Sequence, residues 1–137
     1  MLCYLDSSVL LRVIFKERGA LPEFRKISHA VSSDLLRVEC LRTIDRIRLE
    51  KSLTEEEYLR RTALFFDFQR NIELIPVTRE ILTRASQPFP TSLGTLDAIH
   101  LASCVLYRER AGAGIAMCTH DMALSRASSA LGLQTLG

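Results

Sequence analysis

Short apolar runs alternate with longer segments of helical periodicity along this chain. The first run, Leu2–Leu5, stops after four residues at a polar cluster, residues 6–8, and a helix-periodic segment follows at residues 9–15. So short a run, ending at turn-forming residues, favours a buried strand over a helix. The opening therefore predicts a strand, a sharp turn and a helix, with the Asp6 carboxylate at the carboxyl end of the strand.

The same alternation continues to the end of the chain. Further strands are predicted at 30–33, 72–77, 115–118 and 133–136, and helices at 22–27, 35–49, 54–70, 78–87, 96–108 and 122–130. Thr54 and Glu57 form a capping-box pattern, and Thr95 is placed to cap a later helix. Pro76 cannot donate to a ladder, so its strand is expected at a sheet edge or to end there. Strands alternating with helices imply an α/β fold with a mainly parallel sheet covered on both faces.

Composition narrows the class of protein. The length of 137 residues suits one domain, and no linker or internal repeat divides it. No apolar run approaches the ~18 residues of a transmembrane helix, and no signal-peptide pattern opens the chain. The four cysteines lack metal-binding spacing, so we expect reduced thiols in a cytoplasmic protein that does not engage a membrane. A net charge of +2 does not demand a polyanionic partner.

Four acidic residues are placed to meet at one edge of the predicted sheet. Asp6 and Asp121 each follow a strand, Asp97 lies in the first turn of a helix, and Glu39 lies about one turn into another. Ligands of open α/β sheets bind in the crevice outside the carboxyl ends of the strands. Each acid also has a structural explanation, such as a helix cap for Asp6 or a helix-dipole interaction for Asp97. The convergence of the four acids favours a functional site. An acid can cap a helix or interact with its dipole and still belong to that site.

Four short blocks carry a resemblance to a known family. They are residues 4–11 (YLDSSVLL), 38–42 (VECLR), 95–102 (TLDAIHLA) and 118–121 (CTHD). Their order and spacing resemble the PIN-domain ribonucleases, most closely the VapC toxins of bacterial toxin–antitoxin pairs. The resemblance implies a single PIN-like nuclease domain, residues 1–137, folded as a three-layer α/β/α sandwich around a central parallel sheet. It also implies metal binding by Asp6, Glu39, Asp97 and Asp121, with Ser7 and Thr119 as supporting or water-holding groups.

Electrostatics explains why such a cluster needs a cation. Two charges about 4 Å apart repel by about 4 kcal/mol at an effective dielectric constant of about 20. Carboxylate oxygens suit hard ions, and we expect Mg²⁺ or Mn²⁺. Asp6 and Asp97 are the expected primary ligands, Asp121 completes the site, and Glu39 positions water or a second ion. The predicted reaction is metal-assisted attack of water on an RNA phosphodiester.

Other interpretations stay open. The main alternative to an endoribonuclease is a non-catalytic PIN-like module that binds RNA or protein. A phosphoacceptor domain is disfavoured, because Ser8 stands where a second acid is wanted and no lysine follows Lys51. His100 and His120 are interpreted as structural or surface groups, although histidine can also act near neutral pH.

The resemblance also implies partners. They are an RNA substrate, a cognate antitoxin protein and a second copy of the chain in a homodimer. Candidate surfaces are the first helices and helix 54–70, which contains a group made of Leu64 and the aromatic residues Phe65, Phe66 and Phe68. We expect that group to be mainly core, with an exposed patch for a partner as the alternative.

Overall fold

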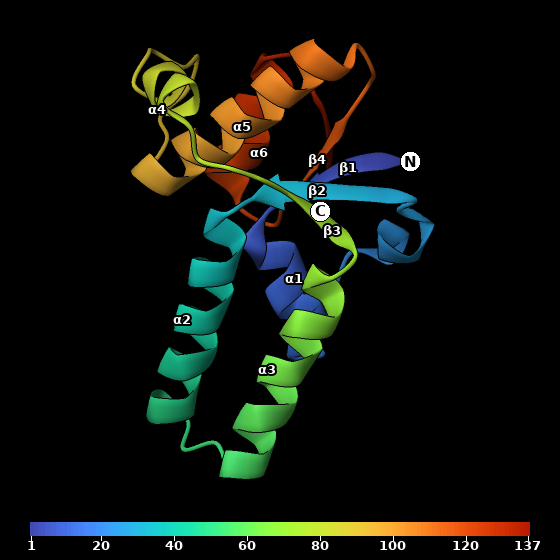
Figure 1. Cartoon of the computed structure of the whole chain (residues 1–137), viewed down its shortest axis with the longest axis vertical. Coiled ribbons are helices and arrows are strands. Elements are labelled where there is room, and N and C mark those ends of the chain that lie inside the picture. The colour runs from blue at the N-terminus through green and yellow to red at the C-terminus, as the bar shows by residue number, and fades with distance from the viewer.

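The computed structural model describes residues 1–137, apart from the side chain of Glu23 (Figure 1). The strands are β1 (Leu2–Leu5), β2 (His29–Ser33), β3 (Ile72–Ile75), β4 (Ala116–Cys118) and β5 (Gln134–Leu136). The helices are α1 (Ser7–Ile14), α2 (Leu35–Glu50), α3 (Glu55–Gln69), α4 (Arg79–Ala85), α5 (Thr95–Ala111) and α6 (Met122–Ala130), with a 3-10 helix at Pro22–Lys26. Each predicted element is present, with bounds that differ by at most three residues.

The strands form one parallel sheet in the order β3-β2-β1-β4-β5. β1 is therefore central, and its carboxyl end lies between those of β2 and β4. Helices α4, α5 and α6 lie on one side of the sheet, and α1, α2 and α3 lie on the other (Figure 1). This three-layer α/β/α arrangement confirms the predicted fold class. The edge position of β3 confirms the expectation drawn from Pro76.

β1 is buried on both faces, and this explains its continuous apolar sequence. Tyr4 packs in a core with Leu101 of α5 and Met117 of β4. Cys3 and Leu5 belong to a second core, because successive side chains of a strand point to opposite faces. Fully burying a large apolar side chain contributes about 1.5–3 kcal/mol. β1 is thus firmly held, and the residue that follows it emerges at a fixed place on the sheet's rim.

The helical hairpin of α2 and α3 extends away from the sheet (Figure 1). A third core joins the hairpin to α1, with Phe65 fully buried against Leu10 and Ile14 and the other aromatic residues of α3 partly buried. The aromatic group is therefore mainly core, as expected. The capping box is confirmed, because Thr54 Oγ1 accepts from the Glu57 N–H and the Glu57 carboxylate accepts from the Thr54 N–H.

The predicted cap of α5 is wrong. The helix already begins at Thr95, and its N-cap is Gly94, in an extended conformation with no side-chain hydrogen bond. The helix ends at Ala111, and its C-cap, Gly112, adopts a left-handed conformation with φ 60°. As its apolar sequence predicted, α5 is buried along much of its length.

Two expectations from composition can be compared with the fold. All four cysteines are buried, as expected for small hydrophobic side chains. Within the part of the chain that the structure describes, no helix is both long enough and apolar enough to cross a membrane.

Candidate metal centre

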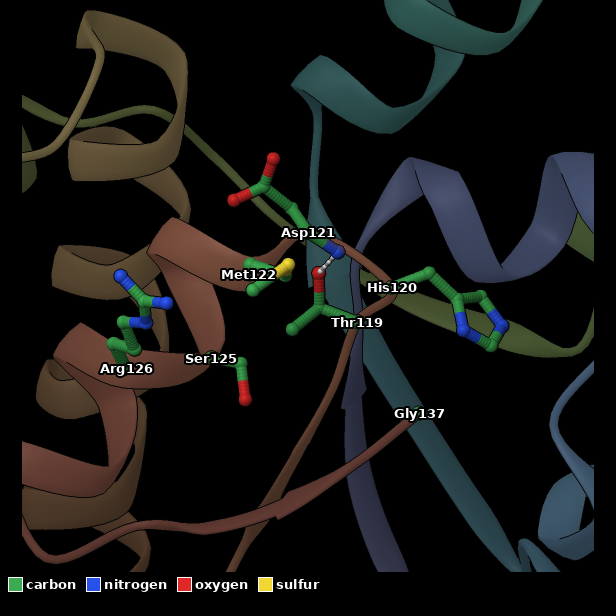
Figure 2. Close-up of a pocket in the computed structure, with 7 residues that line it drawn as sticks. All are labelled: Thr119, His120, Asp121, Met122, Ser125, Arg126 and Gly137. Carbon is green, nitrogen blue, oxygen red and sulfur yellow. Dashed lines mark hydrogen bonds between the residues drawn. The ribbon is translucent and has the colours of Figure 1, made fainter.

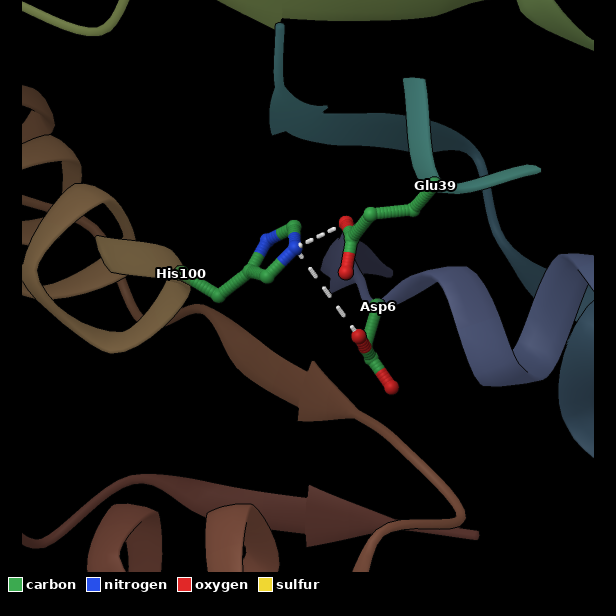
Figure 3. Close-up of side chains that lie close together, drawn as sticks. All are labelled: Asp6, Glu39 and His100. Atoms are coloured by element: carbon green, nitrogen blue, oxygen red, sulfur yellow. Dashed lines mark hydrogen bonds and ion pairs between the residues drawn. The ribbon is translucent and has the colours of Figure 1, made fainter. Parts of the chain in front are cut away.

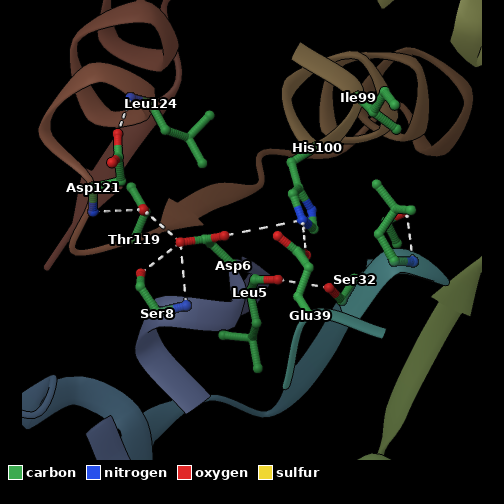
Figure 4. Close-up of polar contacts among 12 residues, drawn as sticks. Leu5, Asp6, Ser8, Ser32, Glu39, Ile99, His100, Thr119, Asp121 and Leu124 are labelled. Carbon is green, nitrogen blue, oxygen red and sulfur yellow. Dashed lines mark hydrogen bonds and ion pairs between the residues drawn. The ribbon is translucent and has the colours of Figure 1, made fainter. Parts of the chain in front are cut away.

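Asp6 follows β1 directly and is the N-cap of α1. Its side chain is buried, and Oδ2 accepts hydrogen bonds from the Ser8 N–H (3.3 Å), the Ser8 hydroxyl (2.5 Å) and the Thr119 hydroxyl (2.9 Å) (Figure 4). Asp6 is therefore both the cap of α1 and a candidate metal ligand. Because three donors hold Oδ2, the second oxygen, Oδ1, is left facing His100, whose Nε2 lies 4.0 Å away.

Thr119 connects two of the acids. It follows β4, and its hydroxyl donates to Asp6 Oδ2 while accepting from the Asp121 N–H at 2.9 Å. Asp121 caps α6, where its Oδ1 accepts from the Leu124 N–H at 2.8 Å. Ser8 adds a second link, because its hydroxyl accepts from the backbone N–H of His120 at 3.0 Å. The ends of β1 and β4 are thus tied together by short polar side chains.

Glu39 reaches the same place from α2 and His100 from α5. His100 is fully buried, and its Nε2 lies 2.5 Å from Glu39 Oε1, while Nδ1 lies 2.9 Å from the hydroxyl of buried Tyr4. One ligand atom each from Asp6, Glu39 and His100 lies within 4.8 Å of the other two (Figure 3). Sequence reasoning had not placed His100 in the site. The structure shows that it is no surface group.

Asp97 completes the set of acids from the first turn of α5. Burial, followed by the charges of Asp121 and Asp6, raises the pKa of Asp97 from 3.8 to about 6, and Glu39 acts in the same direction. His100 partly opposes them. The charges of Asp121, Asp6 and Glu39 therefore all act on Asp97.

His100 is electrostatically coupled to this cluster. Burial lowers the pKa of His100, but the hydrogen bond with Glu39 and the charges of Glu39, Asp6 and Asp97 outweigh burial, so the pKa lies above its ordinary value. Burying a charged group is costly unless it is paired, and the neighbouring carboxylates provide that pairing for the His100 imidazole. Its signal in the sequence was its position among the apolar residues of α5.

The hydroxyls that contact Asp6 belong to Ser8 and Thr119. Ser8, rather than Ser7, donates to Asp6. Ser7 is the first residue of α1, and the cap geometry places the residue after it over the carboxylate. Thr119 does contact Asp6, from the position where sequence reasoning placed a supporting group.

A pocket of about 240 Å³ opens beside Asp121. It is lined by Thr119, His120, Asp121, Met122, Ser125, Arg126 and Gly137 (Figure 2). Arg126 is exposed, and no ion pair involving it occurs among the described residues. The His120 ring turns toward α1, away from Arg126 (Figure 2). The pocket therefore has the Arg126 guanidinium and the Asp121 carboxylate in one lining.

The donor set fits a hard divalent cation. Asp6, Glu39 and Asp121 each have one carboxylate oxygen in a hydrogen bond, and within the described residues the other oxygen of each has no hydrogen-bond donor. The pKa of Asp97 is raised first by burial and then by the negative charges of Asp121 and Asp6. An oxygen-rich cluster with oriented, unused oxygens is suited to a divalent metal ion.

Comparison with known proteins gives three findings. The PIN domain profile matches residues 3–128. Ribonuclease VapC46 of Mycobacterium tuberculosis is 31% identical to this chain over an alignment of 137 positions. The alignment covers 97% of this chain and 95% of that protein. Two solved structures share the fold. One is Rickettsia felis VapBC2 bound to a promoter DNA fragment, with a TM-score of 0.68, 11% sequence identity and coverage of 100% of both chains. The other is a Klebsiella pneumoniae toxin–antitoxin complex, with a TM-score of 0.60, 19% sequence identity and coverage of 87% of this chain and 86% of that chain.

Proposed function

We propose a nuclease function from one premise, that this chain belongs to the PIN-domain family. In the proposal, residues 1–137 form a single domain that hydrolyses RNA phosphodiester bonds with Mg²⁺ or Mn²⁺ and serves as the toxin of a toxin–antitoxin pair. The observation that carries it is the group formed by Asp6, Glu39 and His100, whose ligand atoms lie within 4.8 Å of one another. The charges of Asp121, Asp6 and Glu39 also act on Asp97, and this supports assigning Asp97 and Asp121 to the same site. The related ribonuclease supports RNA as the substrate.

The hydrogen bonds of the site favour a small ion over Ca²⁺. Ca²⁺ takes 6–8 oxygens and often binds carboxylates through both of them. Asp6, Glu39 and Asp121 each have one oxygen held by the protein and one to offer. Single contacts suit the six-coordinate geometry of Mg²⁺, which keeps several waters. When bound, such an ion makes water more acidic and neutralises charge that develops on the phosphate.

The residues have separate roles in this proposal. Asp6 is the central ligand, because Ser8 and Thr119 fix its orientation. Asp97 and Asp121 are the outer ligands, on the side open to solvent. The free oxygen of Glu39, which reaches the site from α2, would orient water or a second ion. The pKa of Asp97, about 6, leaves this carboxylate mainly ionised at neutral pH and able to bind a cation.

The pocket beside Asp121 gives the RNA backbone a place to bind. Arg126 lines it without an ion-pair partner among the described residues. A guanidinium is well suited to phosphate, and it would offset the repulsion between RNA and the acidic cluster. We therefore assign Arg126 to the phosphate next to the one that is cleaved.

The proposed RNA substrate also implies a location. An enzyme that cleaves cellular RNA would act in the cytoplasm.

An antitoxin and a second copy of the chain are the proposed protein partners. The hairpin of α2 and α3 carries exposed apolar side chains that do not contribute to the cores, among them Val38 (58% exposed), Leu49 (65%) and Leu59 (56%). Burying such side chains at an interface is favourable. Co-expression with the neighbouring reading frame followed by pull-down checks for an antitoxin, and the absence of a stable complex would contradict this part.

The experiment that tests the function is RNA cleavage by purified protein. We expect cleavage with Mn²⁺ or Mg²⁺, none with EDTA, and a loss of at least a hundredfold in Asp6→Asn. The buried Asn variant keeps the shape of the side chain, and circular dichroism checks its fold. RNA that is bound by the wild type with Mn²⁺ present but not cut would instead favour the non-catalytic module.

A further inference from the structure

We propose that His100 is itself a metal ligand, completing with Asp6 and Glu39 a mixed nitrogen–oxygen site that selects Mn²⁺ over Mg²⁺. The inference rests on the proposed metal dependence and specifies its inner binding position. An all-carboxylate site, by contrast, would leave His100 as a structural partner of Glu39.

The distances fit an ion placed between these three side chains. Nε2 of His100 lies 2.5 Å from Glu39 Oε1 and 4.0 Å from Asp6 Oδ1. Two ligands at right angles, each about 2.1 Å from one ion, lie about 3 Å apart. The observed separations lie on either side of this value. A small rotation of the Glu39 side chain, which is 18% exposed, would bring both carboxylates and the imidazole onto one ion.

The surroundings of His100 match those of a ligand histidine. Metal-binding histidines nearly always have their second ring nitrogen held by a hydrogen-bond partner, which fixes the ring and its tautomer. Here Nδ1 lies 2.9 Å from the Tyr4 hydroxyl, and Tyr4 is fully buried in β1. A metal ion would displace the proton shared by Nε2 and Glu39. With Nδ1–H still donating to the Tyr4 hydroxyl oxygen, the lone pair of Nε2 would then be directed at the ion between Asp6 and Glu39. A histidine that only oriented Glu39 would not need to face a second carboxylate.

A nitrogen ligand has a consequence for metal choice. Mg²⁺ is bound by oxygen ligands and keeps its waters, whereas imidazole suits transition metals. Replacing one oxygen position by His100 therefore favours Mn²⁺ relative to Mg²⁺. We expect Mn²⁺ to bind more tightly than Mg²⁺ in the wild type, and His100→Gln to reduce this preference. Tyr4→Phe, which frees the imidazole, should weaken Mn²⁺ binding about tenfold.

Pulsed electron paramagnetic resonance of the Mn²⁺-loaded protein tests the ligand directly. The chain has three histidines, so protein made with ¹⁵N-labelled histidine carries the label at few positions. We expect a ¹⁴N coupling in unlabelled protein that becomes a ¹⁵N coupling in labelled protein. His100→Gln should abolish the coupling. His29→Gln, an exposed histidine paired with Glu73, and His120→Gln should retain it.

The outcomes separate this inference from the proposed function. Bound Mn²⁺ without a histidine coupling would overturn the assignment of His100, even if RNA is cleaved. A protein that does not bind Mn²⁺ at millimolar concentration would also overturn the assignment of His100. A histidine coupling in a protein that never cleaves RNA would support the site and contradict the nuclease. The labelled wild type decides the question even if His100→Gln fails to fold.

Discussion

The hydroxyl of Thr119 lies 2.9 Å from Oδ2 of Asp6, although 113 residues separate the two in the chain. The same hydroxyl accepts the backbone N–H of Asp121. One small side chain therefore fixes two of the acids that we assign to the metal. Neither acid is positioned by its own strand alone, because the contact forms only when β1 and β4 are paired.

Removal of this hydroxyl should loosen the site. In Thr119→Val the shape is nearly kept, but Asp6 loses a donor and the Asp121 N–H loses its acceptor. Loss of such outer contacts typically costs 10–100-fold in metal affinity, and we expect a loss of about tenfold for Mn²⁺ by calorimetry. The unfolding free energy should fall by about 1–3 kcal/mol.

Thr62 offers a matched control for that substitution. Its buried hydroxyl has no hydrogen-bond partner in the described structure, so Thr62→Val removes no such bond. Mn²⁺ affinity should be unchanged in this variant. Equal losses in the two valine variants would mean that Thr119 acts only through general stability.

Asp97 should make stability depend on pH. Its pKa is raised from 3.8 to about 6 in the folded state, so the folded protein holds this proton more tightly than the unfolded chain does. Without metal, stability should therefore fall as the pH rises from about 4 to about 6 and stay level above. A shift of this size corresponds to about 3 kcal/mol, which screening at this half-buried site reduces to about 1 kcal/mol.

The variant Asp97→Asn checks this account with EDTA present. It should be about 1 kcal/mol more stable than the wild type at pH 7 and lack the loss of stability between pH 4 and pH 6. It should also fail to cleave RNA. Asp67→Asn, an exposed acid on α3, serves as the control. A metal-free Asp97→Asn protein less stable than the wild type at pH 7 would contradict the electrostatic account.

Arg126 should affect binding rather than chemistry. In Arg126→Ala we expect KM for RNA to rise about tenfold with little change in kcat, because one phosphate contact is lost. The dependence of log affinity on log salt should become shallower by about 0.7 for a single-stranded substrate. Arg60→Ala, an exposed arginine on α3, should change neither quantity. Identical kinetics in the two variants would remove Arg126 from the RNA path.

Parts of the site could be predicted from the sequence because strand ends can be located locally. Asp6 directly follows an apolar run and Asp121 comes three residues after the end of another, and a parallel sheet brings the carboxyl ends of its strands to one edge. Asp97 and Glu39 could be placed from helix starts. Their shared edge follows from the alternation of strands and helices, without any knowledge of packing.

Other parts depend on packing between elements distant in sequence. His100 lies three residues after Asp97, about 60° away around the helix. Only the packing of α5 on β1 turns it toward Tyr4 and Glu39. The choice of Ser8 over Ser7 depends on the exact turn after β1, which residue types alone do not determine. Neither the orientation of His100 nor the contact from Ser8 can be read from the spacing of apolar and polar residues.

Thermal unfolding with Mn²⁺ measures most directly whether the acids share an ion. Binding only to the folded state at one hundred times Kd adds about 2.7 kcal/mol. We predict a melting temperature that rises with Mn²⁺ concentration in the wild type, reverses with EDTA, and does not rise in Asp6→Asn. A wild-type melting temperature that is insensitive to Mn²⁺, or an equal rise in Asp6→Asn, would contradict the metal centre.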